Sequence, residues 1–252
     1  MKHTSTLFCF PYAGGSAVMF NKWRRLLDKS VELHPVEYAG RGKRIFEPLY
    51  PSLEAAVDDL LRLIRPFLGL RPYVLFGHSL GGMMTFELTR RIGAENLPPP
   101  VHVVISGRGA PHIPRPDRKT LHDLPDEEFK KEILELGGTP REFFDHPELM
   151  EMMLPLIKGD FRLAETYRRP PEPVPLDVDL TVLVGEEEDL IPEQISGWPG
   201  YARRSFTMHR LPGGHFFINE RMEQVVQIVN QIVIKPQAVH AAAPRAEAAV
   251  ER

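Results

Sequence analysis

One serine of the chain lies in a motif that makes serine side chains into nucleophiles. Residues Gly77-His78-Ser79-Leu80-Gly81 fit the pattern Gly-x-Ser-x-Gly, directly after the apolar run 73–76 and before a helical pattern. A strand, a sharp turn and a helix in this order expose the serine hydroxyl at the turn, and the flanking glycines leave room for the strained backbone. We therefore predict that Ser79 is a nucleophile. The competing interpretation is a glycine-rich turn whose serine has no chemical role.

Ten histidines are candidates for the base that a serine nucleophile requires. His215 is the predicted base, because it follows the last strand candidate in a loop where Gly213 and Gly214 give the backbone freedom. In parallel α/β sheets the active site lies beyond the carboxyl ends of the strands, where this loop is expected. His78 adjoins Ser79 in the sequence, but a sharp turn directs neighbouring side chains away from each other.

An acidic run supplies the carboxylate that orients such a histidine and stabilises its imidazolium form. The strand candidate 180–184 is followed by Gly185 and then by Glu186, Glu187, Glu188 and Asp189. Asp189 is the predicted acid and Glu188 is the alternative, because four consecutive acids leave the register open. The resulting order of nucleophile, acid and base, Ser79, Asp189 and His215, is the order of α/β-hydrolases.

Two backbone N–H groups are predicted to form an oxyanion hole, which stabilises the negative oxygen of a tetrahedral intermediate. One is the amide of Leu80, the residue after the nucleophile. The other is the amide of Ala13, after the first strand candidate, where Gly14 and Gly15 allow close backbone approach. The same glycines would suit a phosphate-binding loop, but the spacing of nucleotide-binding motifs is missing and the histidines are scattered. Neither a cofactor nor a metal centre is predicted.

Short β-rich runs alternate with helical patterns along the chain. The strand candidates are residues 6–10, 31–38, 73–76, 101–106, 180–184 and 205–211. Several are continuous apolar runs, as expected of strands buried on both faces of a parallel sheet. Between them, apolar residues recur at helical spacing over 53–68 and again over 225–233, with Ser52 placed as an N-cap. The alternation predicts an α/β fold with a mostly parallel central sheet covered by helices on both faces.

One stretch interrupts this alternation, since residues 111–175 contain helical segments and prolines but no strand candidate. A plain connection between two strands is far shorter, so a helical lid is predicted there. The lid is expected to be an insertion in a single α/β-hydrolase domain of residues 1–234. The Ala- and Pro-rich tail of residues 235–252 has almost no bulky apolar side chain and is predicted to be disordered.

The composition excludes several classes of function. The 252 residues carry a formal net charge of −3, which provides no positive field for nucleic acid. No apolar run approaches the ~18 residues of a membrane span, so no membrane association is expected. Cys9 is the single cysteine, which rules out an internal disulfide and agrees with a reducing compartment. A cytoplasmic protein is therefore expected.

Several separated motifs resemble the type II thioesterases that accompany nonribosomal peptide and polyketide assembly lines. The resemblance covers residues 7–234 and rests on the segments Phe10-Pro11-Tyr12-Ala13-Gly14-Gly15, Tyr38-Ala39-Gly40-Arg41-Gly42, Gly77-His78-Ser79-Leu80-Gly81-Gly82, Leu124-Pro125-Asp126, Gly137-Gly138-Thr139-Pro140, Gly159-Asp160-Phe161 and Gly213-Gly214-His215-Phe216-Phe217. It implies an α/β-hydrolase fold and an enzyme that hydrolyses stalled or aberrant acyl and aminoacyl thioesters, with Ser79, His215 and Asp189 as its triad. The enzyme is expected to be a monomer. The chain departs from the family at Ala39, where proline is frequent, and in its denser acidic run.

The resemblance also implies a partner. The acyl group would be attached to the phosphopantetheine arm of an acyl or peptidyl carrier protein, so the substrate carries the phosphopantetheine and the enzyme itself needs no cofactor. Carrier proteins are generally acidic near this arm, and a basic docking surface is therefore expected at the carboxyl edge of the sheet. The candidates are Arg41, Lys43 and Arg44 in one group, and Arg108, Arg115, Arg118 and Lys119 in another.

Two other classes of function fit the same residues. The first is a fatty acyl-carrier-protein thioesterase or a carboxylesterase on the same fold, which a matched pair of thioester and oxygen-ester substrates would distinguish. The second is a noncatalytic module that binds carrier proteins. The presence of a serine, a histidine and an acid in hydrolase order argues against that second class.

Overall fold

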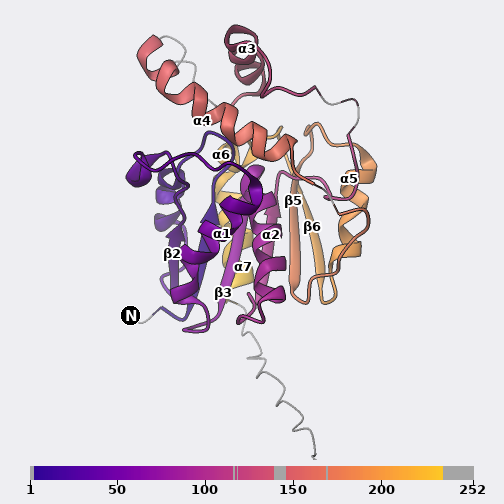
Figure 1. Cartoon of the computed structure of the whole chain (residues 1–252). Coiled ribbons are helices and arrows are strands. Elements are labelled where there is room, and N and C mark those ends of the chain that lie inside the picture. The colour runs from indigo at the N-terminus through magenta and orange to yellow at the C-terminus, as the bar shows by residue number, and fades with distance from the viewer. Residues whose placement is uncertain (1–2, 116, 118, 139–145, 169, 235–252) are drawn as a thin grey trace, which may run out of the picture.

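The strands of the protein form one sheet in which every neighbouring pair runs parallel. The computed structural model describes residues 3–115, 117, 119–138, 146–168 and 170–234. Its strands are β1 Ser5–Phe10, β2 Val31–Pro35, β3 Tyr73–His78, β4 His102–Ser106, β5 Asp179–Gly185 and β6 Phe206–Leu211. They form a six-stranded sheet in the order β2-β1-β3-β4-β5-β6 (Figure 1). The predicted parallel α/β architecture is confirmed.

Helices connect these strands. The α-helices are α1 Leu53–Ile64, α2 Leu80–Ala94, α3 Asp126–Leu136, α4 Pro147–Glu165, α5 Pro192–Ser196, α6 Phe217–Glu220 and α7 Met222–Ile234. The 3-10 helices are η1 Ala17–Arg25, η2 Gly42–Arg44, η3 Arg65–Phe67 and η5 Trp198–Tyr201. No helix in the described part of the chain combines the length and the apolar character needed to cross a bilayer.

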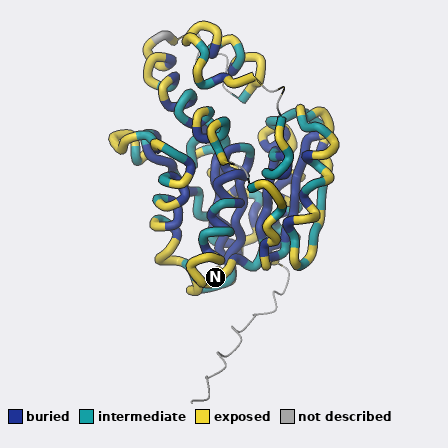
Figure 2. Tube along the Cα trace, turned by 45° about the vertical axis from the view of Figure 1, so that its right-hand side comes forward, coloured by how far each residue is buried: buried dark blue, intermediate teal, exposed yellow. Residues whose placement is uncertain are grey.

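Both faces of the sheet are covered, because successive side chains of a strand point to opposite faces. On one face Phe8 and Phe10 of β1 pack with apolar side chains of α1 and α2. On the other face Leu7 and Cys9 pack with those of η1 and α7. Figure 2 shows the central strands as the buried interior of the molecule. This rigid sheet is the scaffold on which the loops at its carboxyl edge are placed.

Two predicted elements end earlier in the structure than the sequence pattern indicates. β2 ends at Pro35 rather than at residue 38, because it lies at the sheet edge and its neighbour β1 ends at Phe10. α1 ends at Ile64 rather than at residue 68, since Pro66 has no N–H for the next helical hydrogen bond. The start of α1 is as predicted, and Ser52 accepts a hydrogen bond of 3.2 Å from the amide of Ala55.

The long segment between β4 and β5 contains α3 and α4, which lie over the carboxyl edge of the sheet (Figure 1). Among its described residues, an isolated β-bridge at Leu176 is the only strand-like pairing. The two helices share a small apolar core formed by Leu121, Phe129, Ile133, Met150, Leu154, Leu156 and Ile157. Their movement as a lid stays a prediction. The tail of residues 235–252, like Thr139 and Pro140 of the resembling motifs, lies outside the described residues.

Candidate active site

Ser79 lies at the turn between β3 and α2 in a conformation that residues with side chains rarely adopt. Its φ is +55° and its ψ is −113°, a strain of about 1–3 kcal/mol that the surroundings must offset. The amide of Ser79 donates to the carbonyl of Ser106 at 2.8 Å, which ties the turn to β4. A Cβ atom on Gly77 would lie 2.0 Å from the carbonyl oxygen of Gly81, and one on Gly81 would lie 2.1 Å from that of Phe10. The turn therefore requires both glycines of the motif.

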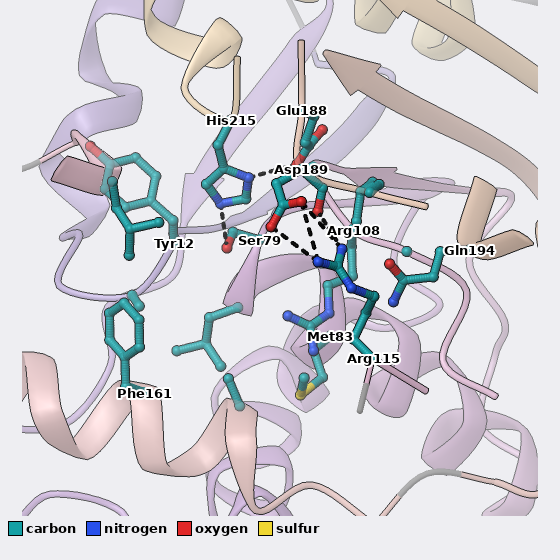
Figure 3. Close-up of a pocket in the computed structure, with 18 of the residues that line it drawn as sticks. Tyr12, Ser79, Met83, Arg108, Arg115, Phe161, Glu188, Asp189, Gln194 and His215 are labelled. Atoms are coloured by element: carbon teal, nitrogen blue, oxygen red, sulfur yellow. Dashed lines mark hydrogen bonds and ion pairs between the residues drawn. The ribbon is translucent and has the colours of Figure 1, made fainter. Parts of the chain in front are cut away.

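The Ser79 hydroxyl begins a series of two hydrogen bonds (Figure 3). Its Oγ lies 2.8 Å from Nε2 of His215, and Nδ1 of His215 lies 2.6 Å from Oε1 of Glu188. A carboxylate can only accept hydrogen bonds, so Nδ1 carries the proton and Nε2 is left to accept from the serine. This is the tautomer that a general base needs. The strand-to-helix turn after β3 and the loop after β6 thus bring Ser79 and His215 into contact.

The carboxylate beside His215 belongs to Glu188, so the preference for Asp189 in this position is wrong. The side chain of Glu188 is 4% exposed, and its second oxygen accepts the amide of Gly185 at 3.1 Å. The side chain of Asp189 is 85% exposed and pairs with Arg115, with 3.3 Å between Oδ1 and Nη2. Glu188, the alternative left open by the sequence, therefore has the contact expected of the acid.

Backbone hydrogen bonds explain which of the consecutive acids faces the histidine. The amide of Glu186 donates to the carbonyl of Leu211 at 2.9 Å, and the amide of Glu187 donates to that of Gly213 at 3.1 Å. These bonds continue the pairing of β5 with β6 into the loop that carries His215. Glu188 is the next residue, and its carboxylate accepts a hydrogen bond from the amide of Gly185, which holds the side chain toward the imidazole.

A second histidine holds the loop of His215 in place. His78 is buried, its Nε2 lies 2.8 Å from the backbone carbonyl of His215, and its Nδ1 lies 2.8 Å from Oγ of Ser106. Because a carbonyl only accepts, Nε2 is the protonated nitrogen and Nδ1 accepts from the serine. Burial, and secondarily the charge of a protonated His215, lowers the pKa of His78 well below its ordinary value of 6.5. The sequence carries no signal for this contact, because the two residues are 137 positions apart.

Ala13 and Leu80, whose amides are predicted to form the oxyanion hole, both border the cavity in front of the serine. Leu80 is the first residue of α2, where helical amides have no carbonyl partner in a preceding turn. Ala13 lies in a tight turn after β1, closed by a hydrogen bond of 2.9 Å from the amide of Gly15 to the carbonyl of Tyr12. Gly14 in this turn has a φ of +75°, which glycine adopts without strain. The role of the two amides as an oxyanion hole stays a prediction.

The cavity in front of Ser79 has mostly apolar walls. Helices α2, α3 and α4 contribute the side chains of Met83, Ile133, Leu136, Ile157 and Phe161. In Figure 3, Phe161 points from its helix into the cavity on the same side as Tyr12. Arg108 and Arg115 border the opposite side. Apolar walls with a few polar groups near the reacting atoms suit the hydrocarbon part of an acyl group.

Two of the basic residues predicted to dock a carrier protein are engaged inside the protein instead. Arg41 is 4% exposed and forms an ion pair with Asp160. The side chain of Arg44 is 11% exposed and pairs with Glu47 and Asp59. The hypothesis that Arg41 and Arg44 are free docking charges is therefore wrong. Of the other candidates, Lys43 and Lys119 are exposed, Arg108 and Arg115 border the cavity, and Arg118 lies outside the described residues.

The strand order and the strained serine bonded to a histidine define a class of protein, the serine hydrolases with an α/β-hydrolase fold. Comparison with protein families makes this more specific. Residues 5–233 match the model of the thioesterase domain. The chain therefore belongs to the thioesterase family and is a thioester hydrolase of the serine hydrolase type.

Individual relatives are similar to this chain over nearly its whole length. The linear gramicidin dehydrogenase LgrE of Brevibacillus parabrevis is 37% identical over 227 residues, which cover 88% of this chain and 85% of that protein. The crystal structure of ClbQ, from the colibactin NRPS/PKS pathway, matches with a TM-score of 0.85 and 37% identity over 90% of this chain and 96% of that one. The type II thioesterase BorB, from the borrelidin biosynthetic cluster, matches with a TM-score of 0.81 and 32% identity over 91% and 93%. The name of LgrE denotes a redox enzyme, whereas the family and the serine site of this chain indicate hydrolysis.

Proposed function

We propose that this protein is a type II thioesterase of a nonribosomal peptide or polyketide pathway. Its substrate is a stalled or aberrant acyl or aminoacyl group, held as a thioester on the phosphopantetheine arm of a carrier protein. The observation that carries this proposal is the hydrogen-bonded series Ser79, His215 and Glu188 beside an apolar cavity. Similarity to BorB, named as a type II thioesterase, and to ClbQ, of an NRPS/PKS pathway, supports the choice of substrate.

The reaction begins when Oγ of Ser79 attacks the carbonyl carbon of the thioester. Nε2 of His215, 2.8 Å away, takes the hydroxyl proton as the new carbon–oxygen bond forms. The carboxylate of Glu188 accepts the hydrogen bond from Nδ1 and stabilises the imidazolium through this contact. The amides of Ala13 and Leu80 donate to the negative oxygen of the tetrahedral intermediate.

Collapse of this intermediate breaks the carbon–sulfur bond. The departing sulfur takes the proton from His215 and leaves as the free thiol of the phosphopantetheine arm, while the acyl group stays on Ser79 as an ester. A water molecule then loses a proton to His215 and attacks the ester carbonyl, again through a tetrahedral intermediate. Return of the proton to Oγ releases the carboxylic acid, so each cycle consumes one water and frees one carrier for reloading.

Substitution of the nucleophile tests this function. Ser79→Ala is expected to reduce kcat by at least about 10⁴-fold, because the remaining groups only bind and polarise the substrate. The measurement is release of the carrier thiol from an acyl-loaded carrier protein, with circular dichroism as a check that the variant is folded. Near-normal turnover by Ser79→Ala would refute the role of Ser79.

A pair of substrates with the same acyl group distinguishes the remaining hydrolase classes. The wild-type protein is expected to show a higher kcat/KM for the acyl-carrier thioester than for the matching oxygen ester. The opposite order would indicate a carboxylesterase. Carrier binding without any thiol release would indicate a noncatalytic module, and reaction of Ser79 with a fluorophosphonate probe provides an independent check of its nucleophilicity.

A further inference from the structure

A buried ion pair joins α4 to the loops at the carboxyl edge of the sheet. Arg41 follows β2 and Asp160 lies on α4, and their side chains are 5% and 3% exposed. Both carboxylate oxygens are engaged, since Nη1 of Arg41 lies 2.7 Å from Oδ2 of Asp160 and Nη2 lies 2.7 Å from Oδ1. This two-pronged contact fixes the orientation of the two side chains as well as their distance.

Both members of the pair also hold the turn that contains Ala13. Oδ2 of Asp160 accepts the amide of Gly14 at 2.7 Å, and Nη1 of Arg41 donates to the carbonyl of Gly15 at 3.0 Å. The amide of Gly14 belongs to the peptide unit that begins with the carbonyl of Ala13, so a bond to this amide restrains where Ala13 lies.

Further contacts restrain the same turn from two sides. A Cβ atom on Gly14 would lie 3.0 Å from Cγ1 of Ile157, so α4 packs directly against the turn. The guanidinium of Arg41 lies 5.1 Å from the centre of the Tyr38 ring, and the hydroxyl of Tyr38 donates to the carbonyl of Pro11 at 2.9 Å. The turn is therefore held between α4 and the loop after β2.

Stability alone is a poor explanation for this pair. Removing two charges from water costs about as much free energy as their mutual attraction returns. A pair of well-packed apolar side chains would therefore stabilise the site at least as much as this ion pair. The cost is increased because Nε of Arg41 is buried without a hydrogen-bond partner among the described residues. Burial lowers the pKa of Arg41, but the charge and hydrogen bonds of Asp160 outweigh burial and raise it, so the guanidinium stays charged.

We propose that Arg41 and Asp160 are positioning residues, through which α4 places the Ala13 amide in the oxyanion hole. This inference deepens and rests on the proposed function, in which that amide stabilises the tetrahedral intermediate. Helix α4 then has two roles in the reaction. Its Phe161 lines the cavity for the acyl group, and the adjacent Asp160 holds the turn that contains Ala13. An oxyanion donor acts on the transition state more than on the bound substrate, so the pair affects kcat rather than KM.

The experiment compares two variants of the full-length protein. Asp160→Asn keeps the shape of the side chain and removes its charge, and it is expected to lower kcat for an acyl-pantetheine thioester about tenfold or more with KM changed less than about twofold. Its affinity for an alkylboronic acid, which forms a tetrahedral anion on Ser79, should fall in proportion to kcat. Its affinity for a nonhydrolysable thioether analogue of the substrate should stay the same. Arg41→Lys keeps the charge, loses the two-pronged contact, and should show the same pattern with a smaller loss.

Asp126→Asn is the matched control, because Asp126 of α3 pairs with Lys158 of α4 at 2.6 Å and its own side chain is 63% exposed. This control should leave kcat and boronic acid affinity unchanged. An unchanged kcat in Asp160→Asn, or an equal loss of kcat and of thioether affinity, would overturn the inference. If circular dichroism shows Asp160→Asn to be unfolded, Arg41→Lys decides by the same criteria, and loss of folding in both would assign the pair to stability instead. Failure of the proposed function is distinguishable, since the wild-type protein would then release no thiol.

Discussion

The carboxylates of Glu188 and Asp189 are adjacent in the sequence but lie in opposite environments, 4% and 85% exposed. Glu188→Gln is expected to lower kcat about 10³-fold or more, because an amide does not stabilise the imidazolium and favours the wrong tautomer of His215. Asp189→Asn removes only an exposed contact with Arg115 and should change kcat less than about twofold. Steady-state kinetics on one acyl thioester compares the two variants. A larger loss of kcat in Asp189→Asn than in Glu188→Gln would show that Asp189 is the acid of the triad.

The buried ring of His78 makes stability depend on pH. Its pKa lies well below the ordinary value of 6.5 in the folded protein, whereas in the unfolded chain it returns to that value. As the pH falls, His78 therefore takes up a proton in the unfolded chain before it does so in the folded protein. The contribution of neutral His78 to the free energy of unfolding is complete above pH 6.5 and is lost progressively below it. Urea unfolding should show that the wild-type protein loses on the order of 1–2 kcal/mol more than His78→Gln between pH 7.5 and about pH 5.

His78→Gln is a suitable comparison, since its amide nitrogen keeps a donor for the carbonyl of His215 but does not titrate in this range. Parallel loss of stability in the two proteins over the same pH interval would show that His78 is not the responsible group.

Single residues of the site differ in how well the sequence predicts them. Ser79 and His215 are recognisable because each lies between or after glycines directly beyond a strand candidate, so local sequence defines their position. These local features do not show which of Glu188 and Asp189 faces the histidine. The orientation of Glu188 depends on backbone hydrogen bonds from the two preceding residues to Leu211 of β6 and to Gly213 of the loop that follows β6.

At the scale of elements, the packing of α2 against the sheet depends on its first turn having no side chain at Gly81. Gly81→Ala is expected to lower the free energy of unfolding by more than about 4 kcal/mol, a loss that only the most severe single substitutions cause. The physical reason is that the added Cβ would lie 2.1 Å from the carbonyl oxygen of Phe10, a backbone atom that cannot move without displacing β1.

Gly93→Ala in the same helix is the matched control. Apart from its chain neighbours and the nearby backbone of its own helix, no atom of the described residues lies within 4 Å of a Cβ added at Gly93. Alanine also favours a helix by about 0.8–1.0 kcal/mol relative to glycine. Thermal unfolding should therefore show a lower Tm for Gly81→Ala and an equal or higher Tm for Gly93→Ala. A Tm of Gly81→Ala equal to that of the wild type would mean that the turn after β3 accommodates a side chain.

Most helices and strands can be predicted from the sequence, because the spacing of apolar residues and the glycines or prolines at element ends are local features of the sequence. Strands buried on both faces, such as β3 and β4, stand out as continuous apolar runs. The end of β2 was not predictable in this way, since it is set by where the neighbouring β1 stops. The same limit applies to Arg41, whose position after a strand suggested an exposed charge although its partner Asp160 comes from a helix 119 residues later.

At the scale of the whole molecule, the parallel sheet gathers residues from distant parts of the chain at one edge. Ala13 follows β1, Ser79 follows β3, Glu188 follows β5 and His215 follows β6, while α3 and α4 lie over the same edge (Figure 1). Cys9 lies inside β1, where burial raises the pKa of its thiol well above the ordinary value, so it does not compete with Ser79 as a nucleophile. The cytoplasmic location and the monomeric state stay predictions.

The covalent acyl-enzyme on Ser79 is the central claim about this molecule, and rapid-quench mass spectrometry of the intact protein tests it most directly. When the wild-type protein is mixed with an acyl-loaded carrier, its mass should rise transiently by one acyl group, at a rate at least equal to kcat. Peptide mapping should place that group on Ser79, and Ser79→Ala should show neither the adduct nor turnover. Steady thiol release without any acyl adduct on Ser79, together with turnover by Ser79→Ala, would contradict it.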